Sequence, residues 1–243
     1  MGAALIESSS ASAERTATAA RRGDVLYRSF GNTGQTVSVL VSVVRISEKP
    51  LPIASRRRSS APPSIAASTS WTTPGTITTV TARRDGYRQK VFLMTKVDGR
   101  TKETAAKQLD ESLKRFQTDH VDLLQFHAVI RMEDSDRFFA PRGALEAFLD
   151  ARKAGKIRFI GFTGHKDPLI HLRVLDMARE HNFRFDAVLF SSNVMDWSFR
   201  SFIHQVMPVA LRDGIALQTM KPWARSSFSK AKWFRRLSAC STH

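Results

Sequence analysis

The sequence contains one cysteine, Cys240, and no hydrophobic run near the roughly 20 residues that a membrane-spanning helix needs. A single cysteine excludes an intramolecular disulfide framework and favours a reducing compartment, so we expect a cytoplasmic protein without a membrane partner. Residues 1–24 lack the apolar segment of a secretory signal, and their Ala, Ser, Thr and Arg content predicts a disordered leader. The histidines show no metal-ligand spacing with cysteines or acids, so no metal site is expected.

Acidic residues are scarce where basic residues are concentrated. The net charge is +16, yet residues 41–84 hold seven Lys or Arg and one acid, and residues 223–243 hold five and no acid. Such segments make a nucleic-acid-binding protein one alternative, with Arg56, Arg57 and Arg58 as contacts. Because the charge is confined to these two segments, we do not expect nucleic acid as the partner.

Residues 45–84 also lack the hydrophobic periodicity of a helix or a strand. They combine the arginines with Pro62, Pro63 and a run of Ser and Thr around Trp71. A loop of about forty residues without structure is uncommon inside a compact domain. We therefore expect this segment to be disordered and foreign to the surrounding fold.

Hydrophobic patterning predicts alternating strands and helices in most of the remaining chain. Residues 27–34 predict a hairpin that continues as a strand at 37–40. Short apolar runs predict strands at 91–97, 119–127, 157–162, 187–190 and 215–220. Amphipathic segments predict helices at 101–117, 143–154 and 168–181, then helical segments on either side of Pro208. This alternation indicates an α/β fold with a parallel sheet. No G-x-G-x-x-G follows any strand, so part of an eight-stranded barrel fits better than a doubly wound sheet.

Two ionisable residues end the first two strands of this region. Lys96 closes one apolar run and His127 closes the next. Residues at the carboxyl ends of barrel strands are where chemistry collects, so Lys96 and His127 form a candidate site. The alternative is a lysine that extends into solvent and a histidine that is hydrogen-bonded in the core.

Four segments resemble the aldo-keto reductases: residues 28–34 (RSFGNTG), 92–96 (FLMTK), 121–127 (VDLLQFH) and 155–161 (GKIRFIG). The resemblance covers residues 26–40 and 85–222. It implies a (β/α)8 TIM barrel over residues 25–222 that binds NADPH and reduces a small aldehyde or ketone. We expect this barrel to be incomplete, with strands 1 and 2 scrambled and strand 8 missing beyond residue 243. The oligomeric state stays open.

The resemblance also assigns roles to the candidate site. In the family, hydride passes from the nicotinamide to the carbonyl carbon while a tyrosine hydroxyl protonates the oxygen. A lysine lowers the pKa of that tyrosine, an aspartate holds the lysine, and a histidine orients the carbonyl. Lys96 and His127 match the lysine and the histidine. Thr72 and Ile77 stand where the aspartate and the tyrosine belong, and isoleucine donates no proton, so we expect little or no reductase activity.

Further residues match positions that meet the cofactor in the family. Thr163 matches a carboxamide contact of strand five, and Asn193 matches a cofactor-binding position after strand six. Met220 and Lys221 match the seventh-strand contacts of the nicotinamide and the pyrophosphate. Leu189 stands where many members carry a carboxamide-binding glutamine, and the 2′-phosphate site is expected beyond residue 243. Packing at strand ends is the alternative role for these residues. A barrel relative without catalytic activity, which binds a nucleotide or a partner, is the alternative function.

A change of reading frame would account for the absence of the aspartate and the tyrosine. Trp71 is always encoded by TGG and Thr72 by a codon that begins AC, so the shifted frame reads GAC, aspartate. The codons around them allow Phe-Met-Asp-Asn-Ser-Trp-Asp-Tyr-Asn, which contains the family motif. In the tail, Trp223 and Ala224 likewise give glycine, within the family pattern Met-Lys-Pro-Met-Gly. Our hypothesis is that residues 41–84 and 223–243 are translated out of frame.

Resequencing the gene around codons 41, 84 and 222 tests this hypothesis. We expect a base to be gained or lost near each of these codons. A continuous frame that encodes residues 41–84 as printed, together with peptides recovered from that segment, would sink the idea.

Overall fold

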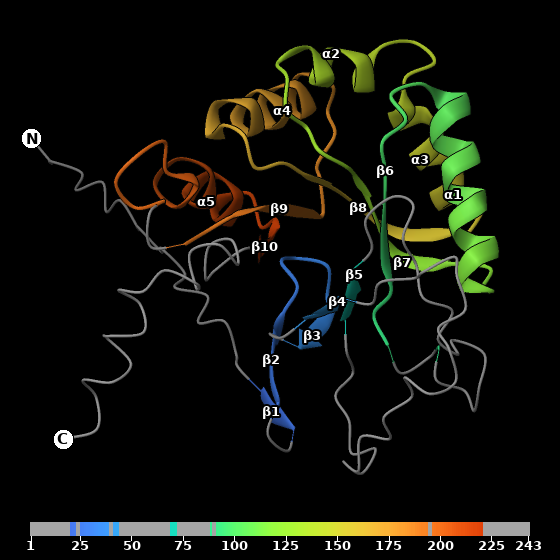
Figure 1. Ribbon diagram of the computed structural model, residues 1–243, viewed down its shortest axis with the longest axis horizontal. Coiled ribbons are helices and arrows are strands. Elements are labelled where there is room, and N and C mark those ends of the chain that lie inside the picture. The colour runs from blue at the N-terminus through green and yellow to red at the C-terminus, as the bar shows by residue number, and fades with distance from the viewer. Residues whose placement is uncertain are drawn as a thin grey trace, which may run out of the picture.

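The computed structural model describes residues 20–22, 25–38, 41–43, 69–71, 88, 91–193 and 196–220. Its centre is a parallel sheet of five strands in the order β10-β9-β8-β7-β6 (Figure 1). The strands are β6 (Met94–Val97), β7 (Val121–Phe126), β8 (Ile157–Thr163), β9 (Ala187–Ser191) and β10 (Ala216–Met220). Each is the neighbour of the next one in sequence, as in consecutive strands of a barrel.

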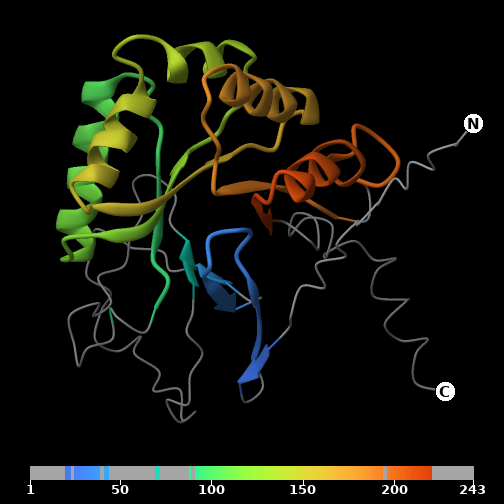
Figure 2. The ribbon, with the colours of Figure 1, turned by 180° about the vertical axis from the view of Figure 1, so that it is seen from behind.

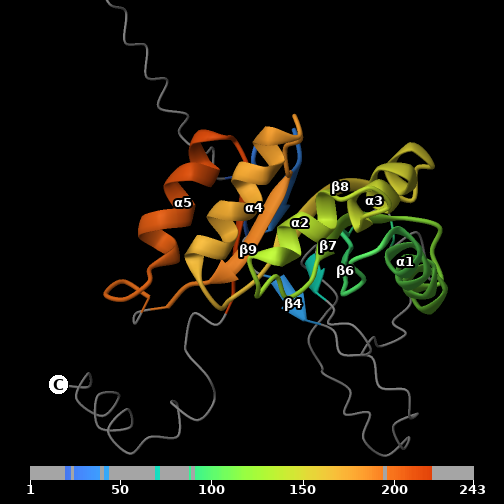
Figure 3. The ribbon, with the colours of Figure 1, turned by 90° about the horizontal axis from the view of Figure 1, so that it is seen from above.

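Helices connect these strands and lie together on the outer side of the curved sheet (Figure 3). They are α1 (Lys102–Phe116), α2 (Glu133–Phe139), α3 (Ala144–Lys153), α4 (Pro168–Glu180) and α5 (Phe202–Arg212). In the described part of the chain, no helix is long and apolar enough to cross a membrane. The predicted βαβ alternation and the parallel sheet are confirmed.

Strand side chains alternate between two apolar clusters, because successive residues of a strand point to opposite faces. Val97, Leu124 and Phe126 pack with the helices in the larger cluster. Met94 and Leu123 belong to a smaller cluster on the inner side, together with Phe30. The inner cluster lies where the interior of a barrel is filled.

The predicted hairpin closes the amino-terminal end of this interior. Strands β2 (Val25–Ser29) and β3 (Thr36–Ser38) pair antiparallel, and their turn approaches the start of β10 (Figures 1 and 2). The amide of Asn32 donates to the carbonyl of Gly214 over 2.9 Å. Gly31 has a φ of +54°, and a Cβ there would lie 2.6 Å from the backbone of Ala216. Glycine is required by both the conformation and the close approach.

Local sequence signals fix several helix ends. Thr101 caps α1 in a capping box with Thr104, and Asp167 caps α4 by accepting from the amide of Leu169 over 2.9 Å. Pro168 occupies the first turn of α4, where its missing N–H costs nothing. Gly155 follows α3 with a φ of +72°, the conformation of a C-terminal glycine.

Three expectations need correction. Pro208 lies inside α5, which is a single helix rather than two segments. Pro208 has no N–H to donate to the carbonyl of His204, and both residues are exposed to water. Phe202, Val206 and Ala210 hold the other face of the helix in the core. Burial of that face outweighs the lost hydrogen bond.

The other corrections concern segments expected to lack structure. Within the leader, β1 (Ala20–Arg22) pairs antiparallel with β2. Within the segment 41–84, β4 (Val41–Val43) and β5 (Thr69–Trp71) pair in parallel, and β5 contacts β6. These short strands are secured by backbone pairing, which side-chain periodicity does not reveal. Thr72, Ile77 and Lys221 lie outside the described residues.

His171 of α4 provides a pH-dependent test of this packing. Its side chain is fully buried against Phe162 and Phe202, and burial lowers its pKa from 6.5 to about 4. Because the unfolded chain binds this proton more readily, stability is complete above pH 6.5 and falls as the pH drops toward 4. The shift corresponds to roughly 3 kcal/mol in the free energy of unfolding.

We expect His171→Met to remove most of this pH dependence, measured by urea unfolding at several pH values. His204→Gln, at an exposed position of α5, is the control and keeps the slope of the wild type. Equal slopes for wild type and His171→Met between pH 4 and 6.5 would contradict the assignment.

Candidate active site

Lys96 and His127 lie at the carboxyl ends of neighbouring strands. Lys96 of β6 is in register with Gln125 of β7, and His127 follows two residues later. The amide of His127 donates to the carbonyl of Val97 over 2.8 Å, which continues the pairing beyond β7. The two sequence-predicted residues are therefore brought together at one edge of the sheet.

Lys96 is buried, with 9% of its surface exposed, so the alternative of a lysine that extends into solvent is wrong. It follows Met94 on the inner face of β6 at the spacing of two that keeps side chains on one side. Burial lowers the pKa of Lys96 from 10.5 to about 8, and the charge of nearby Asp98 opposes this shift. A carboxylate thus acts on this lysine, from a position just beyond the same strand.

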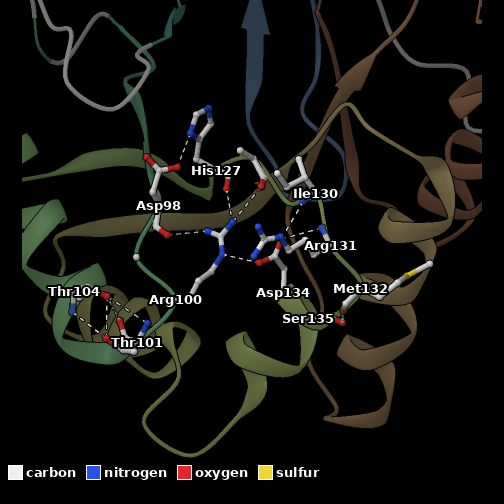
Figure 4. A network of polar contacts seen from close by, with 12 residues as sticks. Asp98, Arg100, Thr101, Thr104, His127, Ile130, Arg131, Met132, Asp134 and Ser135 are labelled. Atoms are coloured by element: carbon white, nitrogen blue, oxygen red, sulfur yellow. Dashed lines mark hydrogen bonds and ion pairs between the residues drawn. The ribbon is translucent and has the colours of Figure 1, made fainter.

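Asp98 also contacts the imidazole of His127. The distance from His127 Nδ1 to Asp98 Oδ1 is 2.7 Å, and the other ring nitrogen points away from Asp98 (Figure 4). The side chain of His127 is 24% exposed. Burial lowers its pKa below 6.5; the contact with Asp98 works against this, and the charges of Lys96 and Arg100 add to it. His127 is a partly buried imidazole paired with a carboxylate, and not a core residue.

Arg100 ties together the loops that carry these groups. Its guanidinium donates to the carbonyls of Asp98, His127 and Ala128 over 3.0, 2.9 and 3.1 Å (Figure 4). Its Nε also pairs with the carboxylate of Asp134 over 3.1 Å. Such a planar group with several donors fixes the geometry of its acceptors. The ends of β6 and β7 are held by one side chain.

Asp134 completes this network from the start of α2. Its Oδ2 accepts from the amides of Ile130 and Arg131 over 3.0 and 3.1 Å, so the loop after β7 is folded around its carboxylate (Figure 4). Burial acts to raise the pKa of Asp134, but the hydrogen bonds from those amides and the charge of Arg100 together outweigh it and lower the pKa.

A buried amide pair lies on the inner face of the sheet, level with Lys96. Gln125 Nε2 donates to Gln218 Oε1 of β10 over 2.9 Å, across the barrel interior. Gln125 is completely buried, and its Oε1 has no hydrogen-bond partner among the described residues. The interior therefore changes from apolar side chains to polar ones toward the carboxyl ends of the strands.

The proposed cofactor contacts occupy the ends of the next three strands. Thr163 ends β8, Met220 ends β10, and Asn193 lies two residues beyond β9. Asn193 and Met220 are partly exposed, whereas Thr163 is buried and its carbonyl accepts from the amide of Val129 over 2.8 Å. Leu189 is buried in the inner apolar cluster and offers no polar atom. Among the described residues there is no cluster of three or more metal-ligating side chains.

Four further residues of the site were not predicted from the sequence: Asp98, Arg100, Asp134 and Gln125. Residues 98–100 (DGR) follow the apolar run directly, and this change to charged residues is a signal that could have been used. Asp134 and the Gln125–Gln218 pair depend on contacts distant in sequence and carry no local signal.

Comparison with known proteins agrees with this architecture. A sequence profile described as the Aldo/keto reductase family matches residues 76–236, more than half of the chain. This chain belongs to the aldo/keto reductase family. The match begins inside the segment 41–84 and ends inside the tail 223–243.

Two curated relatives of this family member are proteins called methylglyoxal reductase DkgB, from Salmonella typhi and from Salmonella typhimurium. Each is 26% identical over 137 residues, which are 54% of this chain and 50% of the relative. The chain thus spans about half the length of the curated relatives it matches.

Solved structures share the fold. The crystal structure of PA4992, a putative aldo-keto reductase from Pseudomonas aeruginosa, superposes with a TM-score of 0.58 and 16% identity, over 83% of this chain and 80% of that chain. A second structure of a putative aldo-keto reductase from the same organism gives a TM-score of 0.58, covering 79% of this chain and 76% of that chain. An α/β barrel of the family type, incomplete in the described residues, is therefore the fold.

The burial of Lys96 predicts that this residue lowers stability. Its pKa of about 8 means that the unfolded chain holds the proton more tightly, so stability rises with pH between about 8 and 10.5. At neutral pH the buried ammonium costs up to roughly 3 kcal/mol relative to the unfolded chain.

We therefore expect Lys96→Met to raise the free energy of unfolding at pH 7, measured by urea denaturation. Lys107→Met, at an exposed position of α1, is the matched control and changes stability little. A Lys96→Met protein that unfolds at lower urea concentration than wild type contradicts this expectation.

Proposed function

We propose that this chain carries part of an NADPH-dependent carbonyl reductase site and reduces aldehydes or ketones slowly. The observation that supports this is the placement of buried Lys96 beside His127 at the carboxyl ends of β6 and β7, with Asp98 acting on both. We further propose a cytoplasmic location, because the sequence has a single cysteine.

The family typically uses a nicotinamide cofactor, which supplies hydride when bound. Asn193 and Met220, partly exposed at the ends of β9 and β10, fit the nicotinamide end of such a group. Leu189 provides only apolar packing there. The fit is thus carried by two adjacent strand ends, and we propose NADPH by resemblance to the family.

The residues of the chain have separate tasks in this proposal. His127 borders the carbonyl oxygen, where a hydrogen-bond donor stabilises developing negative charge. Lys96 supplies a positive charge below pH about 8 in the same place. The tyrosine that protonates the oxygen in the family has Ile77 at its position. Since general acid catalysis is worth roughly 10²–10⁴-fold, the rate is reduced by a factor of this order.

The substrate class follows from the family and its curated relatives. Two curated relatives that match this chain are named methylglyoxal reductase. We propose small aldehydes and ketones as substrates, with methylglyoxal as the first compound to test.

The rate of NADPH oxidation with methylglyoxal and a panel of aldehydes tests the proposal. We expect the 243-residue chain to be roughly 10²–10⁴-fold slower than a chain whose codons 41–84 are read in the shifted frame. The matched control is the shifted-frame chain with Lys96→Met, which should lose most of the gain.

Equal rates for the two chains would contradict the loss of the general acid. Quenching of NADPH fluorescence on binding, with no turnover in either chain, would instead indicate the non-catalytic relative.

A further inference from the structure

We propose that Asp98 and His127 form a carboxylate–imidazole dyad in which His127 is the proton donor that replaces the missing tyrosine, and Asp98 is its positioning residue. The inference rests on the proposed function, since it concerns the proton of carbonyl reduction. It assigns a role to Asp98, which lies just after β6.

The geometry of the pair defines which ring nitrogen can act. A carboxylate only accepts hydrogen bonds, so at 2.7 Å His127 Nδ1 carries the hydrogen that it donates to Asp98 Oδ1. The other nitrogen, Nε2, points away from Asp98 (Figure 4). In the neutral ring Nε2 then has a lone pair and no hydrogen. His127 can donate to a carbonyl oxygen only as the imidazolium.

This tautomer changes the task of the histidine. A neutral imidazole with its hydrogen on Nε2 could donate a hydrogen bond to a carbonyl without titrating. With the hydrogen on Nδ1 the neutral ring repels a carbonyl oxygen, whereas the imidazolium donates both a hydrogen bond and a proton from Nε2. Asp98 stabilises that imidazolium by its charge, as the buried aspartate does for the histidine of a catalytic triad.

The dyad is held in place from two sides. The amides of Asp98 and Gly99 donate to Gln108 Oε1 of α1 over 2.8 and 2.9 Å. Arg100 binds the carbonyls of Asp98 and His127. The loop on each side of the pair is therefore fixed by hydrogen bonds to its backbone, and the two side chains are left to face each other.

Proton transfer from His127 completes the reduction of the carbonyl group. A bound reduced nicotinamide would supply the hydride that the carbonyl carbon accepts, and the electron pair of the C=O π bond would move to oxygen. The oxygen takes the proton from His127 Nε2, so the products are an alcohol, the oxidised nicotinamide and neutral His127. Asp98 keeps its charge throughout, and solvent returns a proton to Nε2 before the next turnover.

The charged groups around His127 set the pH at which this operates. Asp98 favours the imidazolium, while burial and the charges of Lys96 and Arg100 disfavour it and hold the pKa of His127 below 6.5. Asp134 pairs with Arg100 from the far side. The imidazolium form of His127 is therefore a minority at neutral pH. Its population rises about tenfold for each pH unit of acidification down to the pKa of His127.

The experiment that tests the dyad without turnover is NMR of the ring nitrogens of His127 in the full chain. We expect the neutral ring of the wild type to carry its hydrogen on Nδ1. Asp98→Asn keeps an acceptor but removes the charge, so it should keep this tautomer and titrate at lower pH. Asp98→Ala should move the hydrogen to Nε2. Asp119→Asn is the matched control, because exposed Asp119 and His120 form a similar pair at 2.6 Å outside the site.

A second measurement follows the rate of NADPH oxidation with methylglyoxal against pH. We expect the wild-type rate to rise as the pH falls toward the His127 titration seen by NMR, and Asp98→Asn to shift the rise to lower pH. His127→Gln should lose the rise, and Asp119→Asn should keep it.

The outcomes separate the two proposals. Reduction that is independent of pH in this range, or an Nε2–H tautomer in the wild type, overturns the dyad and leaves the proposed function standing. Absence of reduction at every pH overturns the proposed function and, with it, the role of His127 as a proton donor, even where NMR shows the Asp98 contact.

Discussion

The candidate site depends on a guanidinium that joins two strand ends. Arg100 donates hydrogen bonds to three backbone carbonyls and one carboxylate, so its side chain is held in a single position. One of these carbonyls belongs to Ala128, which has a φ of +49°, a conformation that costs energy for any residue with a Cβ. That turn carries the chain away from β7 directly after His127. Without the charge-assisted bonds of Arg100, the imidazole and Asp98 would not be held at a fixed separation.

The interior of the barrel changes from apolar to polar side chains toward the carboxyl ends of its strands. Near its amino-terminal end the hairpin residue Phe30 packs with Met94 and Leu123, a fully apolar arrangement. One step further along the strands, Lys96 and Gln125 occupy equivalent positions and bring an ammonium and an amide out of water. Burying such groups opposes folding unless they are well paired. Sites of this kind are tolerated where chemistry needs them, and this is where the fold departs most from simple apolar packing.

The extent to which the sequence predicts this structure varies with the physical signal. Strands β6 to β10 and helices α1, α3 and α4 follow from hydrophobic periodicity and from caps such as Thr101 and Asp167, which act within a few residues. The seven-residue helix α2 was missed because its start is organised by Asp134, whose partner Arg100 lies on another loop.

The site shows the same division. The positions of Lys96 and His127 follow from the ends of two apolar runs, and these residues do lie together. The contact of Asp98 with His127 could not be predicted, because it depends on how two loops are oriented after strands that are adjacent only in the folded sheet. Pro208 was misjudged since its local effect was weighed without the buried face of α5.

Lys96 and His127 share one carboxylate, Asp98, which raises the pKa of both groups. Burial disfavours both Lys96 and His127 as cations, and the charge of Lys96 further lowers the pKa of His127. A single carboxylate can compensate the first positive charge better than the second. Because the lysine holds its proton up to pH about 8, it takes that compensation first, and the imidazolium must form beside an existing ammonium. The lysine is protonated first because its pKa of about 8 lies above that of the imidazole, and burial together with the charge of Lys96 places the proton-donating state of His127 below its ordinary pKa of 6.5.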